Sequence, residues 1–366
     1  MTRARLGLLT GVVVVCVALV VVYVLQVRHV GAVSAATAPT VATVPMAGVL
    51  AGPHVVFRST ALGSDYGKLA AVPLADPAGP RALGGLSCER VYATSSAGVC
   101  VTASGGIAPT YAVDALDADL ASTSSSPLAG LPSRARMSVD GRLVSTTTFI
   151  TGHSYAASSF STATVIRVAG RSLPNLESWT TFLPDGQKLV AANRNFWGVT
   201  FAPDDDTFYA TAASGTTTWL VRGSIKTRTM RALRTDAECP SLSPDGRHVA
   251  YKKRLGNPTP GVWRLASLDL TTGAETLLAE TRNVDDQMEW RDNSSVLYAL
   301  PRTGTEATTS DVWSVPADGS GTPDVFVPYA SSPAVVTAPA SPPAQAAPAA
   351  APQTPLSSTA SRRSSH

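Results

Sequence analysis

The chain has 366 residues, enough for one large all-β domain with a full core. Its formal net charge of +3 arises at the two ends, and removing the five terminal bases from the 29 leaves 24 against 26 acids. These bases are Arg3, Arg5, Arg28, Arg362 and Arg363. The middle of the chain has no basic excess, which argues against a nucleic-acid partner.

Residues 6–25 form an apolar run whose only clearly polar member is Thr10. A helix of this length spans about 30 Å, one hydrocarbon thickness. The run predicts a single-pass anchor in the cytoplasmic membrane through residues 6–27, and the two preceding arginines favour an N-terminus inside. A cleaved signal peptide is the alternative, with Ala36-Thr37-Ala38 as cleavage site and a secreted product. Either interpretation places the rest of the chain outside the cytoplasmic membrane.

Two further segments have the composition of connecting or disordered chain. Residues 29–51, rich in Ala, Val, Thr and Pro, predict a linker after the anchor of residues 1–28. Residues 334–366, rich in Pro, Ala and Ser and without any acid, predict a disordered tail. Residues 52–333 remain for the folded domain.

Cys88 and Cys100 flank a strand–turn–strand pattern. Folded about residues 94–96, the two cysteines face each other across an antiparallel pair, at a separation that a disulfide tolerates. We expect this disulfide in an oxidising compartment, where it contributes about 3 kcal/mol; two buried thiols are the alternative. Cys239 then stays unpaired, and the lack of a CxxC pattern predicts no metal site.

Short β-rich runs punctuated by Gly, Pro, Asp and Ser fill residues 52–330. The clearest unit is Cys239–Lys253, CPSLSPDGRHVAYKK, which is two short strands joined where Asp245-Gly246 supply positive-φ positions. Related turns recur around four other aspartates, with spacings of about 40–50 residues that are typical of propeller blades. They are Asp140, Asp185, Asp204 and Asp292. The predicted fold class is all-β: a six-bladed β-propeller, preceded by one transmembrane helix and followed by a disordered tail.

Two details refine the blade pattern. The short interval between Asp185 and Asp204 breaks the period, so we interpret residues 184–193 as an outer hairpin of one blade. Residues 263–270 and 312–316, each followed by a Gly-containing turn, predict third strands that lead into fourth strands.

The strings SPDGRHVAYKK (residues 243–253) and LASLDLTTGAETLL (residues 265–278) are similar to the WD-like repeat of TolB-like six-bladed propellers. Such repeats occur in periplasmic translocation proteins and in prolyl-oligopeptidase propellers. The chain further resembles actinobacterial TolB-like membrane proteins. The strings that carry this likeness are CERVY (88–92), NFWGVTFAPD (195–204), ECPSLSPDG (238–246) and DDQMEW (285–290). The resemblance covers residues 52–335, and it implies an extracytoplasmic binding or scaffold role and no established reaction.

Three segments that enter inner strands carry polar residues, and the loops entering inner strands converge at one mouth of a propeller channel. We predict that six residues form a binding surface there: Arg194, Asn195, Glu238, Asp285, Asp286 and Glu289. The alternative is that they cap strand ends and cross-link neighbouring blades. The carboxylates also make a calcium ion in the channel a candidate ligand.

Other motifs have simpler interpretations. Residues 152–156, GHSYA, resemble a nucleophile elbow, but a β-branched stretch follows where a helix is needed, so an ordinary loop is expected. We expect a solvated turn at residues 204–206 and a solvated strand edge at residues 252–254. Four tryptophans should pack between blades, with one a candidate sugar-stacking platform at the mouth. They are Trp197, Trp263, Trp290 and Trp313.

No credible catalytic set is present, so the sequence favours a non-catalytic, membrane-anchored, extracytoplasmic propeller. It would be a binding or scaffold module for a protein or cell-envelope partner. The alternative is a propeller glycosidase or lyase acting on envelope glycan, with Asp285 or Glu289 as catalytic carboxylates.

Overall fold

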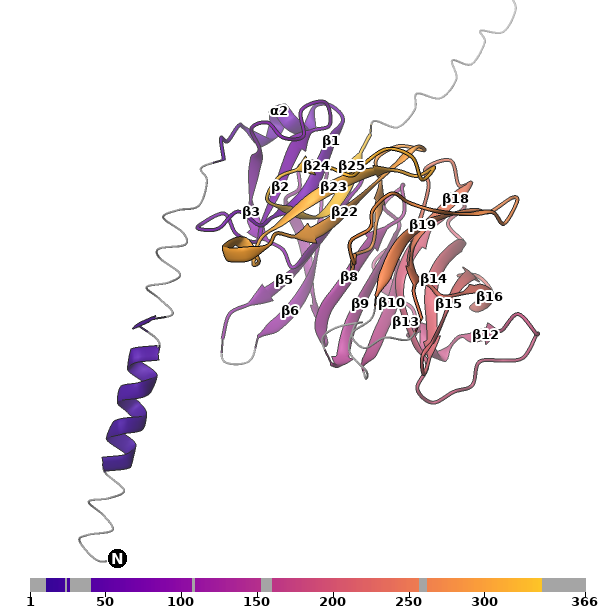
Figure 1. Cartoon of the computed structure of the whole chain (residues 1–366), viewed down its shortest axis with the longest axis horizontal. Helices are drawn as coiled ribbons and strands as arrows, with labels where there is room; N and C mark the ends of the chain where they lie inside the picture. Colours follow the sequence, from indigo (N-terminus) through magenta and orange to yellow (C-terminus); the bar gives the residue numbers. More distant parts are fainter. Residues whose placement is uncertain are drawn as a thin grey trace, which may run out of the picture.

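The computed structural model describes residues 11–23, 25–26, 41–106, 109–152, 160–256 and 262–337. Six sheets, each of four or five strands, make up residues 54–336 (Figure 1). The innermost strands of successive sheets contact one another in a closed circle, in the order β25, β4, β8, β13, β17, β21 and back to β25. The six-bladed propeller expected from the repeat spacing is confirmed.

The strands of the first three blades run outward from the axis as follows. Blade 1 contains β25 (Ala330–Val336), β1 (His54–Ser59), β2 (Lys68–Pro73) and β3 (Ala82–Ser87). Blade 2 contains β4 (Arg90–Ala93), β5 (Gly98–Ser104), β6 (Thr110–Leu116) and β7 (Ser122–Leu128). Blade 3 contains β8 (Leu131–Met137), β9 (Leu143–Thr151), β10 (Ser161–Val168) and β11 (Arg171–Ser172).

Blade 4 contains β13 (Asn195–Phe201), β14 (Thr207–Ser214), β15 (Thr217–Ser224), β16 (Thr229–Thr235) and, parallel to β16 on the outside, β12 (Thr180–Phe182). Blade 5 contains β17 (Ala237–Leu242), β18 (His248–Arg254), β19 (Trp263–Asp269) and β20 (Glu275–Leu277). Blade 6 contains β21 (Glu289–Trp290), β22 (Ser295–Pro301), β23 (Ser310–Pro316) and β24 (Asp324–Val327). Two 3₁₀ turns, η1 (Leu176–Ser178) and η2 (Gly304–Glu306), lie in the connections.

Four of the five repeated Asp turns join the two inner strands of a blade, whereas Asp185 lies between β12 and β13. In blade 5, the Ser243 hydroxyl donates to the Asp245 carboxylate (2.6 Å) and accepts from the His248 amide (2.9 Å), while that carboxylate accepts from the Arg247 amide (3.1 Å). Blade 3 repeats the same three hydrogen bonds at residues 138–143. Gly246 follows with a φ of +71°, the left-handed conformation that the turn requires. The serine and aspartate side chains thus accept hydrogen bonds from backbone amides of the same turn. Because all the partners lie within six residues, the turn can be recognised from the sequence.

The ring closes through the two ends of the domain. β25, the last strand, pairs antiparallel with β1, the first, so that His54 lies opposite Val336 and Ser59 opposite Ala330. The Ser332 hydroxyl then links this strand to the next blade, because it donates to the carbonyl of Val91 (2.9 Å) and accepts from its amide (3.2 Å). The chain therefore enters and leaves the propeller at the same end of one strand pair.

The segment before the propeller is docked rather than free. Helix α2 (Met46–Leu50) lies against blade 1 in Figure 1, with Val49 4% exposed in a core shared with blades 1 and 2. Thr43 forms a parallel bridge with Arg81. The expected linker of residues 29–51 thus ends in packed structure, because its apolar side chains complete this core. The propeller also continues to Val336, beyond the expected end at 333, because β25 is needed to close the ring.

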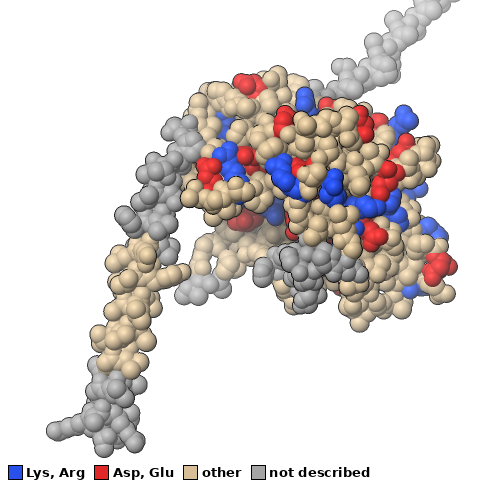
Figure 2. Space-filling model, viewed as in Figure 1, with Lys and Arg blue, Asp and Glu red and all other residues tan. Residues whose placement is uncertain are grey.

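Residues 11–23 are helical, and every valine and leucine described in this helix is half exposed or more. Figure 2 shows the helix without a charged side chain. No helix within the described ranges is both long enough and apolar enough to cross a membrane. The expected anchor also includes residues 6–10, 24 and 27, which lie outside the described residues.

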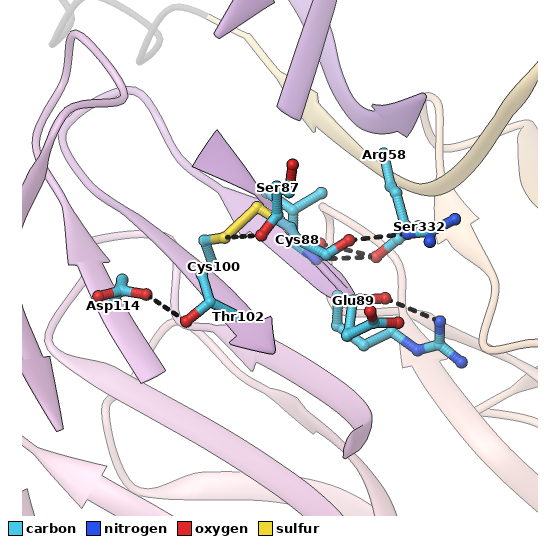
Figure 3. The surroundings of a disulfide bond; sticks show 10 residues. Arg58, Ser87, Cys88, Glu89, Cys100, Thr102, Asp114 and Ser332 are labelled. Atoms are coloured by element: carbon cyan, nitrogen blue, oxygen red, sulfur yellow. Dashed lines mark hydrogen bonds between the residues drawn. A yellow bond between two sulfur atoms is a disulfide. The ribbon is translucent and has the colours of Figure 1, made fainter. Parts of the chain in front are cut away.

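The predicted disulfide between Cys88 and Cys100 is confirmed, with the two Cα atoms 5.4 Å apart. It ties the connection between blades 1 and 2 to β5, and the Arg58 guanidinium of blade 1 donates to the Cys88 carbonyl (2.7 Å; Figure 3). Both cysteines are buried, so the bond reinforces the blade adjoining the ring closure. Cys239 is free and buried, as expected.

Candidate binding site at the mouth of the propeller

We call the end at which the innermost strands begin the mouth, and the end with the Asp turns the base. Two layers of charged side chains lie on the axis, one near the mouth and one closer to the base, contributed by β8, β17, β18, β21 and the connection into β21. We call them the axial cluster. Its members are Arg134, Arg136, Glu238, Lys252, Asp285 and Glu289.

The lower layer is a buried ion pair between Arg136 of β8 and Glu289 of β21. Arg136 also donates to the Ser241 hydroxyl (2.5 Å) and to the Met288 carbonyl (2.8 Å), and its guanidinium lies 4.8 Å from the centre of the Tyr92 ring. The Tyr92 hydroxyl donates to Glu289 (3.2 Å). Side chains from four blades therefore meet at one level of the axis.

A common register explains why these residues meet. In each of three inner hairpins, the last backbone hydrogen bond before the turn is donated by the amide of one residue, namely 138, 243 or 291. The residue two positions earlier is Arg136, Ser241 or Glu289, respectively. Tyr92 has the same position relative to Thr94. Equivalent positions on the inner strands of a propeller face the axis at one height, so side chains over 150 residues apart in sequence become neighbours.

The upper layer lies closer to the mouth. Lys252 of β18 is fully buried, with its ammonium 2.5 Å from the Asp285 carboxylate and 4.0 Å from that of Glu238. Arg134 is 3.8 Å from Asp285, and Arg254 donates to Glu238 (2.7 Å). Asp285 is the accessible member, with about a third of its side chain exposed. A partner entering from the mouth would therefore meet Asp285 first.

The pKa shifts of the upper layer indicate an ionised pair. Burial raises the pKa of Asp285, but Lys252 and then Arg134 lower it more, and the net effect is a pKa below the ordinary value. Burial lowers the pKa of Lys252, and Asp285, the largest opposing influence, brings it above the ordinary value. Both directions favour the charged forms.

The six residues predicted to share the mouth divide into two groups. Glu238, Asp285 and Glu289 belong to the axial cluster. Arg194, Asn195 and Asp286 make structural hydrogen bonds instead. Arg194 donates to the carbonyls of Glu177 and Ala191, Asn195 accepts from the Thr162 amide of blade 3 (2.8 Å), and Asp286 accepts from the Ala299 amide (2.9 Å). Asn195 therefore cross-links blades 3 and 4, whereas Arg194 and Asp286 fix the connecting segments that lead into blades 4 and 6.

The expected solvated edge at residues 252–254 is wrong. Lys252 is completely buried, Lys253 pairs with Glu275 (2.6 Å), and Arg254 pairs with Glu238. β18 lies second from the axis, so both of its faces are covered by neighbouring blades. Sequence reasoning also missed Arg134 and Arg136, although counting back from the Asp140 turn would have placed Arg136 beside the axis.

The calcium candidate finds no support in this geometry, because the axial carboxylates face lysine or arginine side chains. Within the described ranges no group of three or more His, Cys, Asp and Glu side chains could hold a metal ion. Of the GHSYA motif, residues 153–156 lie outside the described residues. Trp197, Trp263 and Trp290 are buried between blades as expected, while Trp313 is partly exposed.

Comparisons with known proteins agree with the fold. The structure is similar to TolB from Acinetobacter baumannii, with a TM-score of 0.52 and 17% sequence identity over 79% of this chain and 67% of that one. It is also similar to a putative TolB from Agrobacterium tumefaciens (0.43, 9%, over 76% and 89%) and to an oligogalacturonate lyase in complex with manganese (0.41, 11%, over 68% and 71%). No protein-family model and no curated sequence matches. At these identities the likeness shows the fold alone.

We predict that Arg136→Met destabilises the protein by about 3–5 kcal/mol, because Glu289 is left buried without its partner. Arg136→Met combined with Glu289→Gln should cost clearly less than the sum of the two single changes. Denaturant unfolding of the full-length chain measures all four states of this cycle. Additive costs would mean that the two side chains act independently.

A second prediction concerns acid. Because the pKa of folded Asp285 lies below its unfolded value of about 4, its contribution to stability is complete above pH 4 and is lost as the pH falls through the folded value. The free energy of unfolding of the wild type should therefore fall more steeply between about pH 4 and pH 2 than that of Asp285→Asn. Parallel curves over this range would show that the Lys252–Asp285 pair does not carry the effect.

Proposed function

We propose that this protein is a membrane-anchored, extracytoplasmic propeller that acts as a non-catalytic binding or scaffold module for a protein or cell-envelope partner. The observation that carries the proposal is the mouth itself. Convergent loops on a rigid scaffold present charged groups there, above an axis closed by the Arg136–Glu289 pair. TolB-like propeller folds support a binding role of this kind.

The mouth also exposes apolar side chains around its charged centre. They come from blades 3 and 5, where β8 begins, β9 and β18 end, and β19 begins, and they are Leu131, Ile150, Leu255 and Val262. Exposed apolar groups beside buried, directional charges are the two components that protein interfaces combine. The geometry therefore suits a folded or extended protein segment better than a single small ion.

The enzyme alternative has weaker support. A glycosidase acid must hold a proton at working pH, which requires a raised pKa and access to substrate. Asp285 is accessible, but its pKa is lowered. Glu289 is buried beneath the mouth and engaged by Arg136, Tyr92 and the Val335 amide. Burial raises the pKa of Glu289 above its ordinary value, opposite to the shift of Asp285, but Glu289 is buried and is not open to a substrate that enters from the mouth.

The orientation of the mouth follows from the proposed anchor. The docked segment of residues 41–50 and the end of β25 both lie at the base. We infer that the base faces the membrane, so the mouth points away from it and toward a partner in the envelope.

The binding role can be tested by photo-crosslinking in cells. A photoreactive amino acid at Ile150, 54% exposed at the mouth, should trap a defined partner in a discrete adduct. The matched control is Val139, 75% exposed in a turn at the base, which should not trap it. Loss of the adduct in Asp285→Lys protein that still melts like the wild type would place the axial cluster in the contact. Equal trapping from both positions would contradict a binding mouth.

Localisation needs a separate measurement. Alkaline phosphatase fused after Thr337 should be active in bacterial cells, and a reporter that works only in the cytoplasm should be silent at the same junction. Retention of the fusion in alkali-washed membranes would distinguish an anchor from a cleaved signal peptide. An active cytoplasmic reporter would overturn the proposed orientation.

A further inference from the structure

A recess lies outside the axial cluster, at the end of blade 6 where β22 leads into β23, beside the connection from blade 5. Its volume is about 310 Å³, at the lower end of the range for ligand pockets. Trp313 of β23 forms one wall, with the Arg282 guanidinium 3.8 Å from the indole centre. Arg302 lines the recess as well and stacks on Tyr329 at 3.7 Å. Two guanidinium groups held flat on aromatic rings therefore border one small space.

The charges around this recess are already paired. Arg282 bonds Glu280 (2.5 Å), and Arg302 bonds both Asp311 (2.8 Å) and Glu306 (2.9 Å). A free anion would meet Glu306 and Asp311, and a free cation would meet the two guanidinium groups. The lining of the recess carries two guanidinium groups and two carboxylates, so neither kind of ion gains a large net electrostatic advantage here.

The recess nevertheless keeps unused hydrogen-bonding capacity. Arg282 donates to Glu280 through Nε and Nη2 and also interacts with the Tyr298 hydroxyl; these contacts use fewer than its five N–H donors, and 44% of its side chain is exposed. The Thr303 hydroxyl does not cap the η2 turn that it precedes. The Glu306 carboxylate is 42% exposed and has lone pairs beyond its bonds to Arg302 and Tyr329. Donors and an acceptor therefore alternate beside the apolar surfaces of Trp313 and Pro301.

We propose that this recess binds a neutral sugar ring of a glycan. Each sugar hydroxyl both donates and accepts, so one ring can accept from Arg282 and Thr303 and donate to Glu306 without burying an unpaired charge. The C–H face of the ring offers the apolar surface that the Trp313 edge and Pro301 can cover. The site lies off the axis, at the mouth end of β22 and β23 but apart from the axial cluster, and it stands whether or not the axial cluster contacts a protein.

Saturation-transfer NMR on the full-length protein tests this assignment. The probes are methyl glucoside and methyl N-acetylglucosaminide as neutral rings, with glucuronate as the anionic and glucosamine as the cationic comparison. Saturation should pass to a neutral ring and to neither charged sugar. No transfer to either neutral ring, or stronger transfer to a charged one, would overturn the proposal.

Substitutions then locate the site. Thr303→Val should weaken binding of the neutral ring several-fold, Thr303→Ser should restore it, and Arg282→Met should weaken it about tenfold while its methylenes still cover Trp313. Arg291→Met is the matched control, since Arg291 at the base is 43% exposed and lies 5.1 Å from the Phe326 ring. Affinity unchanged by Thr303→Val, or lost equally in Thr303→Ser, would refute the site even if Arg282→Met proved unstable.

Discussion

The pairing of β25 with β1 is the constraint on which the rest of the structure depends. A blade covers both of its faces only when a neighbour stands on each side, so the ring has to be closed before any blade is fully packed. Closure joins residues 54–59 to 330–336, nearly the full length of the domain. Three features lie at or beside this strand pair and hold blades 1 and 2 together: Ser332, the disulfide of blade 2 and helix α2.

Segments of different blades and connections are also tied by one recurring arrangement, in which a tyrosine hydroxyl and an arginine meet on the same glutamate while the arginine stacks on an aromatic ring. Among the residues that the structure describes it occurs four times: Tyr92/Glu289/Arg136, Tyr251/Glu275/Arg234, Tyr298/Glu280/Arg282 and Tyr329/Glu306/Arg302. Burial raises the pKa of each tyrosine, so the hydroxyl keeps its proton and remains a donor. Apolar contacts alone allow blades to slide, whereas these directional contacts fix their registration. One of the four closes the axis, and two others border the recess at the end of blade 6.

The sequence predicts the local parts of this molecule well and the long-range parts poorly. The turn at Ser243 and Asp245 is readable because its hydrogen bonds join residues within five positions. Glu238 and Asp285 could be assigned to the mouth because each stands at or before the start of an inner strand, whereas Glu289 lies one layer deeper, two residues before its turn. Arg136 was missed because its partner Glu289 lies 153 residues away, and the residues next to either side chain carry no pattern that indicates the ion pair. Lys252 was misjudged because exposure in a propeller depends on a strand's distance from the axis, which the alternation of residues along that strand does not encode.

The closing strand pair has a mechanical consequence. His54 and Val336 are direct neighbours, and the chain continues from both at the same end of the propeller. If the N-terminal side is held at a membrane and the C-terminal side is pulled, the load separates β1 from β25 like the two halves of a zipper, one hydrogen bond after another. Such peeling needs far less force than sliding two strands past each other, because the bonds fail singly instead of together. The bridge from Thr43 to Arg81 and the packing of Val49 stand in the path of that load and must give way first. The docked segment therefore bears the load before the β1–β25 pair does. The ring can remain closed under tension that would otherwise open it at blade 1, the blade built from both ends of the domain.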